Sequence, residues 1–475
     1  MQIKNGCNTC TNESYVIYCF IERQVTELEM ILNHSAEQVL KTLENAGFKA
    51  YIVGGAVRDS VMGLAPSDYD IATNARPYQV KSLFPRTIDT GLKHGTVTVV
   101  CNKTGFEVTT FRTEGEYKDM RHPESVSYVD DIETDLKRRD FTVNAMAYSL
   151  NGGLLDCFGG VSDIKKRVIR CVGDSESRFK EDALRMLRAV RFAACLDFDI
   201  DEDAVSAIKK CSVLIKNVSG ERVLSELNKI LLSDNPQKIY LLYKTGLMRY
   251  VLADLLPCFS TEQNNKYHIY NVGEHIVESV KNTPKDLVLR WAALLHDVGK
   301  PVCQSRDANG VYHFYGHHKE SMRIADNLLH KLRMDKDSIR DILVLIENHD
   351  VHMDTSPTAV KRMLARTGEG LFFKLLELQE ADNKAKNPLY INDRLNKIKK
   401  VRERAQQIIA EGQPYTISQL QINGRDLIKL GYKAGREIGD ALKYLLNEVL
   451  IDPSLNNREY LIKRAIILKR GRQLR

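Results

Sequence analysis

The sequence lacks any apolar run of the roughly 20 residues that a membrane-spanning helix needs. Its N-terminus lacks the basic stretch and long apolar segment of a secretory signal. The ten cysteines are scattered and do not form a disulfide framework, and we interpret the single Cys7-x-x-Cys10 pair as incidental. No internal repeat or low-complexity segment is visible. These absences predict a cytoplasmic protein with reduced thiols.

At 475 residues the chain exceeds the usual size of one domain, and its 43% of hydrophobic residues suffices for several cores. Lysine and arginine number 69 against 62 aspartate and glutamate, which gives a formal net charge of +7. A modest positive charge of this kind is compatible with a nucleic-acid partner but does not by itself identify one.

The most informative stretch is residues 50–73. An apolar strand, a Gly54-Gly55 turn and a short helix follow one another, and glycines at such a turn let backbone N–H groups approach an anion. Asp68 and Asp70 come next, and residues i and i+2 of a strand point to the same face. A carboxylate pair can hold the Mg²⁺ ions that clamp a nucleoside triphosphate. An isolated Asp-x-Asp is usually a solvated turn, so the order of the elements carries this prediction.

At these residues the chain resembles the DNA polymerase β nucleotidyltransferase superfamily, and more narrowly the class II tRNA nucleotidyltransferases, or CCA-adding enzymes, with their bacterial poly(A) polymerase relatives. The resemblance implies a multidomain α+β protein. Its polymerase β-like head, with a mixed β-sheet and helices, precedes mostly α-helical parts. The implied parts are an N-terminal extension of unknown role (1–29), the catalytic head (30–170), a nucleotide-selecting neck (171–265), an HD metal-binding domain (266–393) and a tRNA-binding tail (394–475).

Two further stretches of the head fit this resemblance. The β-rich runs 95–101 and 105–111 predict a hairpin. Glu107 stands where the superfamily often has a third carboxylate, although an exposed strand glutamate explains it equally well. The polar segment 112–128 predicts a mobile loop. In the family such a loop accompanies the change from C to A addition, which argues against an enzyme that adds only CC; a plain solvated loop would show the same composition.

Residues 138–145, RRDFTVNA, match the family motif RRDFTxNA. Arg139 can bind a triphosphate, and Asp140 can accept a hydrogen bond from a ribose 2′-hydroxyl. Asn144 would support the same region. With the phosphate loop, the nucleotide-binding residues predicted in the head are Gly54, Gly55, Arg58, Arg139, Asp140 and Asn144.

The periodicity of residues 179–192 predicts one helix with Glu181, Arg185 and Arg188 on one face and Asp182 at its edge. Taken alone, this pattern is typical of an i,i+4 salt-bridge face. The resemblance adds a second interpretation, because EDxxRxxR is the family's nucleotide-selecting motif. It implies that Asp182 and Arg185 bond the Watson–Crick edges of C or A. The ERxxxELxKIL match at residues 221–231 is interpreted as a structural brace.

A histidine within a helical run, then a His-Asp pair in residues 296–301, HDVGKP, and a distal aspartate that closes a helix resemble the HD metal-dependent phosphohydrolase superfamily. The implied ligands are His275, His296, Asp297 and Asp382, and His317 and His349 would be added in a site of the two-metal type. Such ligands suit Mn, Ni, Co, Zn or Fe. In the family this domain is linked to phosphatase or 2′,3′-cyclic phosphodiesterase activity, and catalysis and scaffolding both stay open here.

The sequence therefore predicts template-independent addition of CCA to tRNA from CTP and ATP. Asp68 and Asp70 would hold Mg²⁺ and Glu107 would assist. An A-adding enzyme or poly(A) polymerase shares these motifs. HD phosphohydrolysis as the main activity and a non-catalytic RNA-binding role also stay open at the level of sequence. The basic residues from 394 onward fit either phosphate contacts with tRNA or a solvated face.

Overall fold

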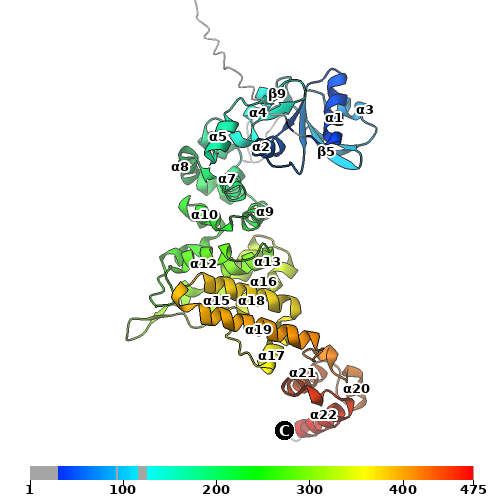
Figure 1. Ribbon diagram of the computed structural model, residues 1–475, viewed down its shortest axis with the longest axis vertical. Coiled ribbons are helices and arrows are strands. Elements are labelled where there is room, and N and C mark those ends of the chain that lie inside the picture. Colours follow the sequence, from blue (N-terminus) through cyan, green and yellow to red (C-terminus); the bar gives the residue numbers. More distant parts are fainter. Residues whose placement is uncertain (1–29, 31, 93–94, 116–125, 474–475) are drawn as a thin grey trace, which may run out of the picture. The chain divides into compact units, whose positions relative to one another are not determined.

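A computed structural model describes residues 30, 32–92, 95–115 and 126–473 (Figure 1). The chain forms two units, which are described separately: the described residues up to Lys166 form unit 1, and those from Arg167 form unit 2. The N-terminal extension, the centre of the predicted loop and Arg475 lie outside the described residues.

Unit 1 is built on a seven-stranded sheet in which only β2 and β5 pair in parallel among the described strand pairs. This arrangement is the mixed sheet predicted for the head. In spatial order the strands are β3 (Thr87–Gly91), β4 (Thr96–Cys101), β5 (Thr104–Thr110), β2 (Asp70–Thr73), β1 (Ala50–Val53), β8 (Ala147–Ser149) and β9 (Gly153–Leu155).

The predicted hairpin is confirmed as β4 and β5, which pair antiparallel. Its turn residues Asn102 and Lys103 have φ angles of 48° and 67°. Positive φ at both central positions matches the twist of the flanking strands, and Asn readily adopts it. The register of β5 against β2 sets Glu107 opposite Asp70.

The helices of unit 1 surround this sheet and one another. They are α1 (His34–Asn45), α2 (Gly55–Val61), α3 (Pro77–Leu83), α4 (Ile132–Lys137) and α5 (Gly160–Lys166), with the 3₁₀ turn η2 (Thr142–Asn144). Helices α1 and α3 contact each other and the strands, whereas α2 contacts β1, α5 and η2 (Figure 1). Val53, Ala72, Phe111, Leu136 and Ala147 form a buried cluster that fixes the ends of β1 and β2.

The segment predicted as a loop begins and ends in strands. β6 (Arg112–Glu114) pairs antiparallel with β7 (Val126–Tyr128). The prediction of an irregular segment is therefore wrong at both ends. Arg76 lies over the ring of Tyr128, at 4.7 Å from its centroid. This contact holds the end of β7, and the polar composition of the segment did not reveal it.

Unit 2 is mostly helical. Its first part contains α6 (Ser175–Glu181), α7 (Leu184–Leu196), α8 (Glu202–Cys211), η3 (Ser212–Asn217), α9 (Gly220–Leu231), η4 (Pro236–Ile239), α10 (Tyr240–Lys244), α11 (Met248–Val251) and η5 (Ala253–Ser260). Strands β10 (Val168–Ile169) and β11 (Asp199–Ile200) pair in parallel beside α7. Helix α7 packs on α9 through apolar faces that include Leu187 and Leu227.

The middle part of unit 2 contains α12 (Val272–Lys281), α13 (Leu287–Leu295), α14 (Lys300–Cys303), the hairpin β12 (Ser305–Arg306) and β13 (Tyr312–His313), α15 (His317–Lys331), α16 (Lys336–Asn348), α17 (Pro357–Thr367) and α18 (Glu369–Lys384). Helix α13 is buried on nearly every side, with Trp291 at its centre, because it contacts α12, α16 and α18.

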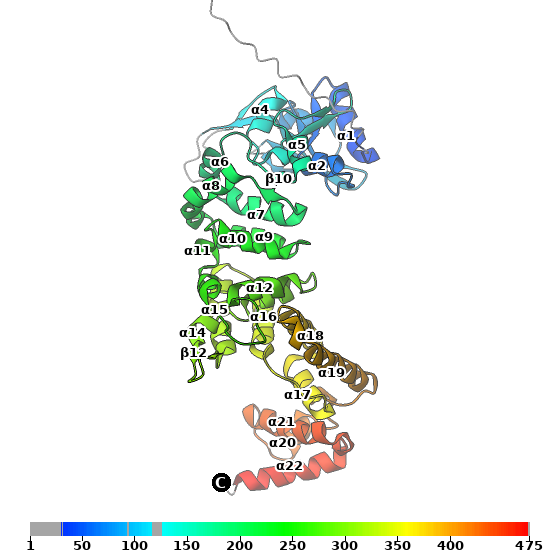
Figure 2. The same cartoon turned by 60° about the vertical axis from the view of Figure 1, so that its left-hand side comes forward.

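The last part contains η6 (Pro388–Tyr390), α19 (Asn392–Ala410), η7 (Ile417–Gln419), α20 (Gly424–Lys429), α21 (Arg436–Ile451), η8 (Pro453–Leu455) and α22 (Arg458–Gln473). Helix α19 packs along α17 and α18, and α21 contacts α17, α20 and α22 (Figure 2). Among the described residues, the helices lack the combination of length and apolar character that crossing a bilayer requires.

Candidate active site and metal centre

Gly54 connects β1 to α2 in unit 1 with φ 73° and ψ −132°, a backbone conformation that L-residues avoid. A Cβ atom at this position would lie 3.2 Å from Nη1 of Arg139 and 3.8 Å from Oδ2 of Asp70. The glycine therefore lets the chain turn while a guanidinium and a carboxylate approach its backbone. Gly55 begins α2, and a Cβ there would lie 3.5 Å from Nη2 of Arg58.

Asp70 is the first residue of β2 and lies opposite Glu107 of β5. Asp68 precedes the strand, so the prediction that both aspartates share one strand face is wrong, because the strand begins two residues later. Desolvation and the negative charge of Glu107 raise the pKa of Asp70; Arg139 opposes this shift and Asp68 adds to it. The structure thus brings the three predicted carboxylates into one electrostatic group.

Arg139 reaches this group from the second residue after α4. Its Nη2 lies 3.4 Å from Oδ2 of Asp135, and Asp135 also binds Arg138 at 2.8 Å. Nε of Arg139 is buried without a hydrogen-bond partner, and desolvation lowers the pKa of its guanidinium. A desolvated cation with an unused donor has the chemistry to bind an anionic oxygen. Sequence analysis missed Asp135, although its i,i+3 and i,i+4 spacing to the two arginines was a usable signal.

The structure brings Arg58 of α2 together with Asn144. Nη1 of Arg58 donates to Oδ1 of Asn144 at 2.8 Å, and Nη2 donates to Oδ1 of Asp59 at 2.7 Å. Asn144 lies in η2, shortly after the buried Asp140, whose Oδ1 accepts from the backbone N–H of Phe141 at 2.9 Å. These contacts fix the RRDFTVNA segment against the start of α2.

In unit 2 the predicted continuous helix over 179–192 is wrong. Helix α6 ends at Glu181, Asp182 is extended with φ −137°, and α7 begins at Leu184. Oδ1 of Asp182 accepts from the backbone N–H of Leu184 at 3.0 Å. A short acidic side chain that bonds to a nearby N–H competes with the helical ladder, which explains the break.

The two acidic residues at this break have different partners. Glu181 binds Arg185 and, at 2.8 Å, Arg178, so the salt-bridge interpretation holds for it. Oδ2 of Asp182 instead accepts from Nη2 of Arg222 on α9 at 3.0 Å. Arg188, on α7, lies over the ring of Phe192. Arg222 was predicted only as part of a brace, and no local pattern links it to an aspartate 40 positions earlier.

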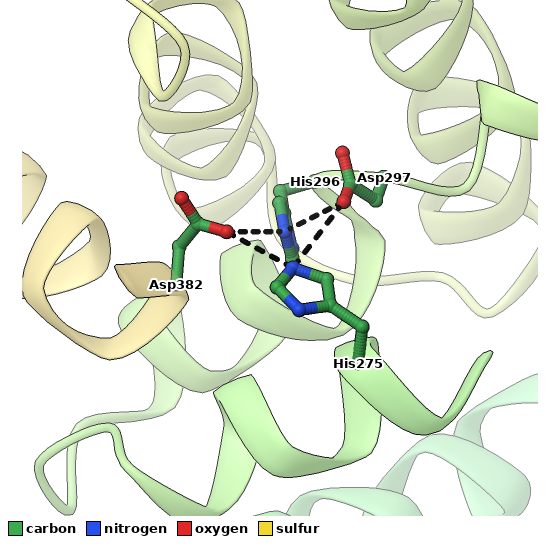
Figure 3. A group of neighbouring side chains, drawn as sticks. All are labelled: His275, His296, Asp297 and Asp382. Atoms are coloured by element: carbon green, nitrogen blue, oxygen red, sulfur yellow. Dashed lines mark hydrogen bonds and ion pairs between the residues drawn. The ribbon is translucent and has the colours of Figure 1, made fainter. Parts of the chain in front are cut away.

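The sequence-predicted histidines and aspartates converge in the middle of unit 2. We name as the histidine–aspartate cluster the six residues His275, His296, Asp297, His317, His349 and Asp382. All six are buried. His275, His296, Asp297 and Asp382 place one ligand atom each within 4.8 Å of one another (Figure 3). The shortest of these contacts is 2.9 Å, between Nε2 of His275 and Oδ1 of Asp382.

Asp297 belongs to a second group with His317 and His349, whose ligand atoms also lie within 4.8 Å of one another. Its Oδ2 faces His275 and His296 at 3.5 and 3.2 Å, whereas its Oδ1 faces His317 and His349 at 3.3 and 3.6 Å. One carboxylate therefore presents a different oxygen to each group. Asp297 could therefore serve as a ligand in both groups.

Backbone carbonyls orient the imidazoles. Nδ1 of His296, His317 and His349 lies within 2.8 Å of the carbonyl oxygen three residues earlier, so Nδ1–H donates to that carbonyl and Nε2 faces the cluster. Metal-ligating histidines are held in this way. Nε2 of His296 is fully buried without a hydrogen-bond partner. An orphaned buried nitrogen aimed into an acidic cluster fits a cation there.

Two lysines, which sequence analysis did not select, compensate the carboxylates. Nζ of Lys300 lies 2.7 Å from Oδ2 of Asp297, and Nζ of Lys386 lies 2.5 Å from Oδ2 of Asp382. Burial opposes ionisation of both carboxyls, but His296 and Lys300 keep the pKa of Asp297 well below its ordinary value, and Lys386 and His275 do the same for the pKa of Asp382. The sequence signal for these ion pairs was their helical spacing, because Lys300 follows Asp297 by three residues and Lys386 follows Asp382 by four.

Comparisons with known proteins agree with the sequence resemblance. Residues 50–170 match the family model "Poly A polymerase head domain", residues 197–259 match "Probable RNA and SrmB- binding site of polymerase A", and residues 315–465 match "tRNA nucleotidyltransferase domain 2". The last match overlaps the region of the histidine–aspartate cluster.

Full-length relatives extend this agreement. The chain is 36% identical over 434 residues to the CCA-adding enzyme of Ligilactobacillus salivarius, and the match covers 90% of this chain and 94% of that protein. It is 34% identical to the CCA-adding enzyme of Latilactobacillus sakei, with 90% and 96% covered. Among solved structures, the Bacillus stearothermophilus CCA-adding enzyme in complex with CTP matches with a TM-score of 0.71 and 30% identity, covering 92% of this chain and 98% of that one.

Proposed function

Because the chain belongs to the family of CCA-adding enzymes, we propose that it adds CCA to the 3′ end of tRNA from CTP and ATP, without a nucleic-acid template. Relatives of nearly the same length carry this name, which favours CCA addition over A-only addition, poly(A) synthesis or phosphohydrolysis as the main activity. The proposal includes action in the cytoplasm. The single observation that carries the chemistry is the meeting of Gly54, Asp70 and Arg139 in unit 1.

Asp68, Asp70 and Glu107 would hold a divalent cation, generally Mg²⁺. Their fit rests on the register that sets Glu107 opposite Asp70, together with the raised pKa of Asp70, which desolvation and then the charge of Glu107 cause; carboxylate oxygens are the ligands that Mg²⁺ prefers. When bound, the cation stabilises the charge that develops on the α-phosphate and on the leaving pyrophosphate. Among the described residues, these three carboxylates are less tightly gathered than the histidine–aspartate cluster, so we expect the nucleotide phosphates to supply further ligands.

The remaining groups of unit 1 position the nucleotide. Arg139 would donate its unused Nε–H, together with Nη1, to the triphosphate beside the Gly54 backbone. Asp140 would accept a hydrogen bond from the ribose 2′-hydroxyl, which favours ribonucleotides. Arg58, held by Asn144, completes the cationic surroundings. The tRNA 3′-hydroxyl attacks the α-phosphate, the bond to the β-phosphate oxygen breaks, and pyrophosphate leaves.

Base selection is assigned to Asp182 and Arg185. A carboxylate can accept from the exocyclic amino group of C or A, and a guanidinium can donate to N3 or O2 of C or to N1 of A. G and U present the opposite pattern there and would leave buried polar groups unpaired, at about 1–3 kcal/mol each. Arg222 would act as a positioning residue, because its bond to Oδ2 of Asp182 fixes the direction of that carboxylate.

The test is incorporation of labelled CTP and ATP, separately and together, on three tRNA transcripts. These end before the first C, after the first C and after the second C of the terminal sequence. Addition of two C residues followed by one A is the expected result. Addition of A only to the longest transcript would identify an A-adding enzyme, and long A tails would identify a poly(A) polymerase. The Asp70→Asn variant serves as the inactive control.

A further inference from the structure

Helix α9 carries Arg222, the residue that holds Asp182, and it lies between α7 and α13 of unit 2 (Figure 1). Toward α7 it forms a buried ion pair, in which Arg191 and Glu226 lie 3.3 Å apart. Toward the middle part of the unit it contacts α13, a helix that is itself almost fully buried. The position of Arg222 therefore depends on what holds α9 from both sides.

A buried arginine of α13 fixes the end of α9. Nη1 of Arg290 donates to the backbone carbonyls of Leu231 and Ser233, the second at 2.7 Å. The last carbonyls of a helix have no partner within the helix, so these bonds cap α9. Nε and Nη2 of the same guanidinium donate to the carbonyl of Thr283 at 3.4 and 3.3 Å. The cap is thus held in place from a third segment.

A tryptophan of α13 fixes the rotation of α9 about its own axis. Nε1 of Trp291 donates to Oδ1 of Asn228 at 2.7 Å, and the indole ring is fully buried. Asn228 follows Arg222 by six positions, so at 3.6 residues per turn the two side chains leave the helix about 120° apart. A rotation of α9 that broke the bond to Trp291 would therefore also move Arg222 relative to α7.

Gly220 begins α9 against the end of α15. A Cβ atom at this position would lie 2.6 Å from the carbonyl oxygen of Lys331 and 3.3 Å from Cα of Leu332. Both neighbours are backbone atoms, so a side chain at Gly220 would force one of the two backbones to shift. Gly220 precedes Arg222 by only two residues, and a shift of α9 would reach Arg222 directly.

We propose that these contacts make the middle part of unit 2 a determinant of nucleotide selection. Arg290, Trp291 and the close approach at Gly220 hold α9 at the height and rotation at which Arg222 orients Asp182. They are positioning residues, because they act through α9. This inference rests on the base selection assigned to Asp182 in the proposed function.

The two oxygens of Asp182 explain why a displaced α9 would alter selection. Oδ1 accepts from the backbone N–H of Leu184 at the start of α7, and Oδ2 accepts from Arg222 at 3.0 Å. Only the second bond depends on α9. Its loss leaves the carboxylate tied at one oxygen and free to turn, so the carboxylate no longer faces the exocyclic amino group of C or A in a fixed direction. Discrimination against U and G should fall.

Gly220→Ala in the full chain tests the inference. The measurement is kcat/KM for single incorporation of CTP and of UTP on a tRNA transcript that ends before the first C. We expect the ratio of CTP to UTP to fall about three- to tenfold, because Arg222→Met, which removes the bond completely, sets an upper limit of about tenfold. Trp291→Phe keeps most of the ring and removes only the N–H donor. It should lower the ratio about two- to fivefold, since its hydrogen bond is neutral.

Gly273→Ala is the matched control. Gly273 also lies at the start of a helix, its φ is not positive, and a Cβ there would lie 2.5 Å from the ring of Phe259. It should lower stability in urea denaturation as Gly220→Ala does, yet keep the wild-type ratio of CTP to UTP. An equal fall of the ratio in both variants would show that general destabilisation is the cause and would overturn the inference.

Combined variants test the route through Arg222. In the Arg222→Met background, Gly220→Ala and Trp291→Phe should cause no further fall of the ratio, because the bond that they disturb is already absent. Losses that multiply, or wild-type ratios in both single variants, would overturn the inference.

Titration calorimetry with CTP and with UTP in the presence of Mg²⁺ gives the corresponding ratio of dissociation constants without turnover. The variants should follow the same order in this assay. Loss of incorporation with this order intact would count against the proposed function alone. A wild-type ratio in Arg222→Met would refute the base selection assigned to Asp182, and this inference with it.

Discussion

Replacement of Gly54 by alanine tests how the head positions its catalytic groups. At φ 73° and ψ −132°, an L-residue is strained by about 1–3 kcal/mol. The new Cβ would also lie 3.2 Å from Nη1 of Arg139, closer than ordinary van der Waals contact. Arg139 has little room to move, because its Nη2 is hydrogen-bonded to the buried Asp135 and the rest of its guanidinium is also buried.

The expected magnitude follows from these two effects. The strain should lower the free energy of unfolding of the head by about 1–3 kcal/mol. Displacement of the guanidinium should cost more in catalysis, because a misplacement of about 1 Å can reduce a rate by about 100-fold. We therefore expect kcat/KM for CMP incorporation to fall by about 10- to 100-fold.

Gly63→Ala provides the matched control. Gly63 has nearly the same φ, 74°, but a Cβ there would meet nothing within 4 Å. It should lower stability without a comparable loss of incorporation. Single-turnover incorporation on a tRNA transcript, together with urea denaturation, separates the two effects. Equal losses of activity in the two variants, or full activity of Gly54→Ala, would refute the reasoning.

Three further outcomes are expected. Arg222→Met should reduce the preference for CTP over UTP about tenfold, because Asp182 loses a charge-assisted hydrogen bond worth about 1.5–3 kcal/mol; Arg333→Met, which removes an exposed ion pair near the same helix, should not. Asp70→Asn should reduce incorporation by at least about 100-fold yet raise the free energy of unfolding at pH 7. The folded-state pKa of Asp70 is raised, so ionisation of Asp70 destabilises the fold as the pH rises through that pKa. The stability that the variant gains, measured by urea denaturation, should therefore shrink as the pH is lowered toward 3.8, the ordinary pKa of an aspartate. Chelation of divalent ions should abolish incorporation, and Mg²⁺ should restore it.

Local signals in the sequence were sufficient where one segment determines its own structure. The strand, glycine turn and helix of residues 50–61 require only backbone sterics and an apolar run, and the Asn102-Lys103 turn requires only two residues that accept positive φ. The order of the histidines and aspartates along residues 275–382 was also recognisable, because it needs only residue identity and spacing.

The sequence prediction failed at Asp182 because its side chain competes with the helical hydrogen bonds. Periodicity favoured one helix over 179–192, but that pattern cannot show that this carboxylate bonds to the N–H of Leu184 and to Arg222. The same limit applies to β6 and β7, where a polar composition predicted a loop and pairing between segments produced strands.

The sequence by itself determined which residue types are present at the two sites: glycines and carboxylates in the head, and six histidines and aspartates in the middle of unit 2. Only the tertiary structure decided how they meet. It set Glu107 opposite Asp70 through strand register, and it turned one oxygen of Asp297 toward His275 and the other toward His317. The physical reason is that these contacts join residues far apart in the chain, whose distances depend on helix packing and sheet pairing rather than on local backbone preference.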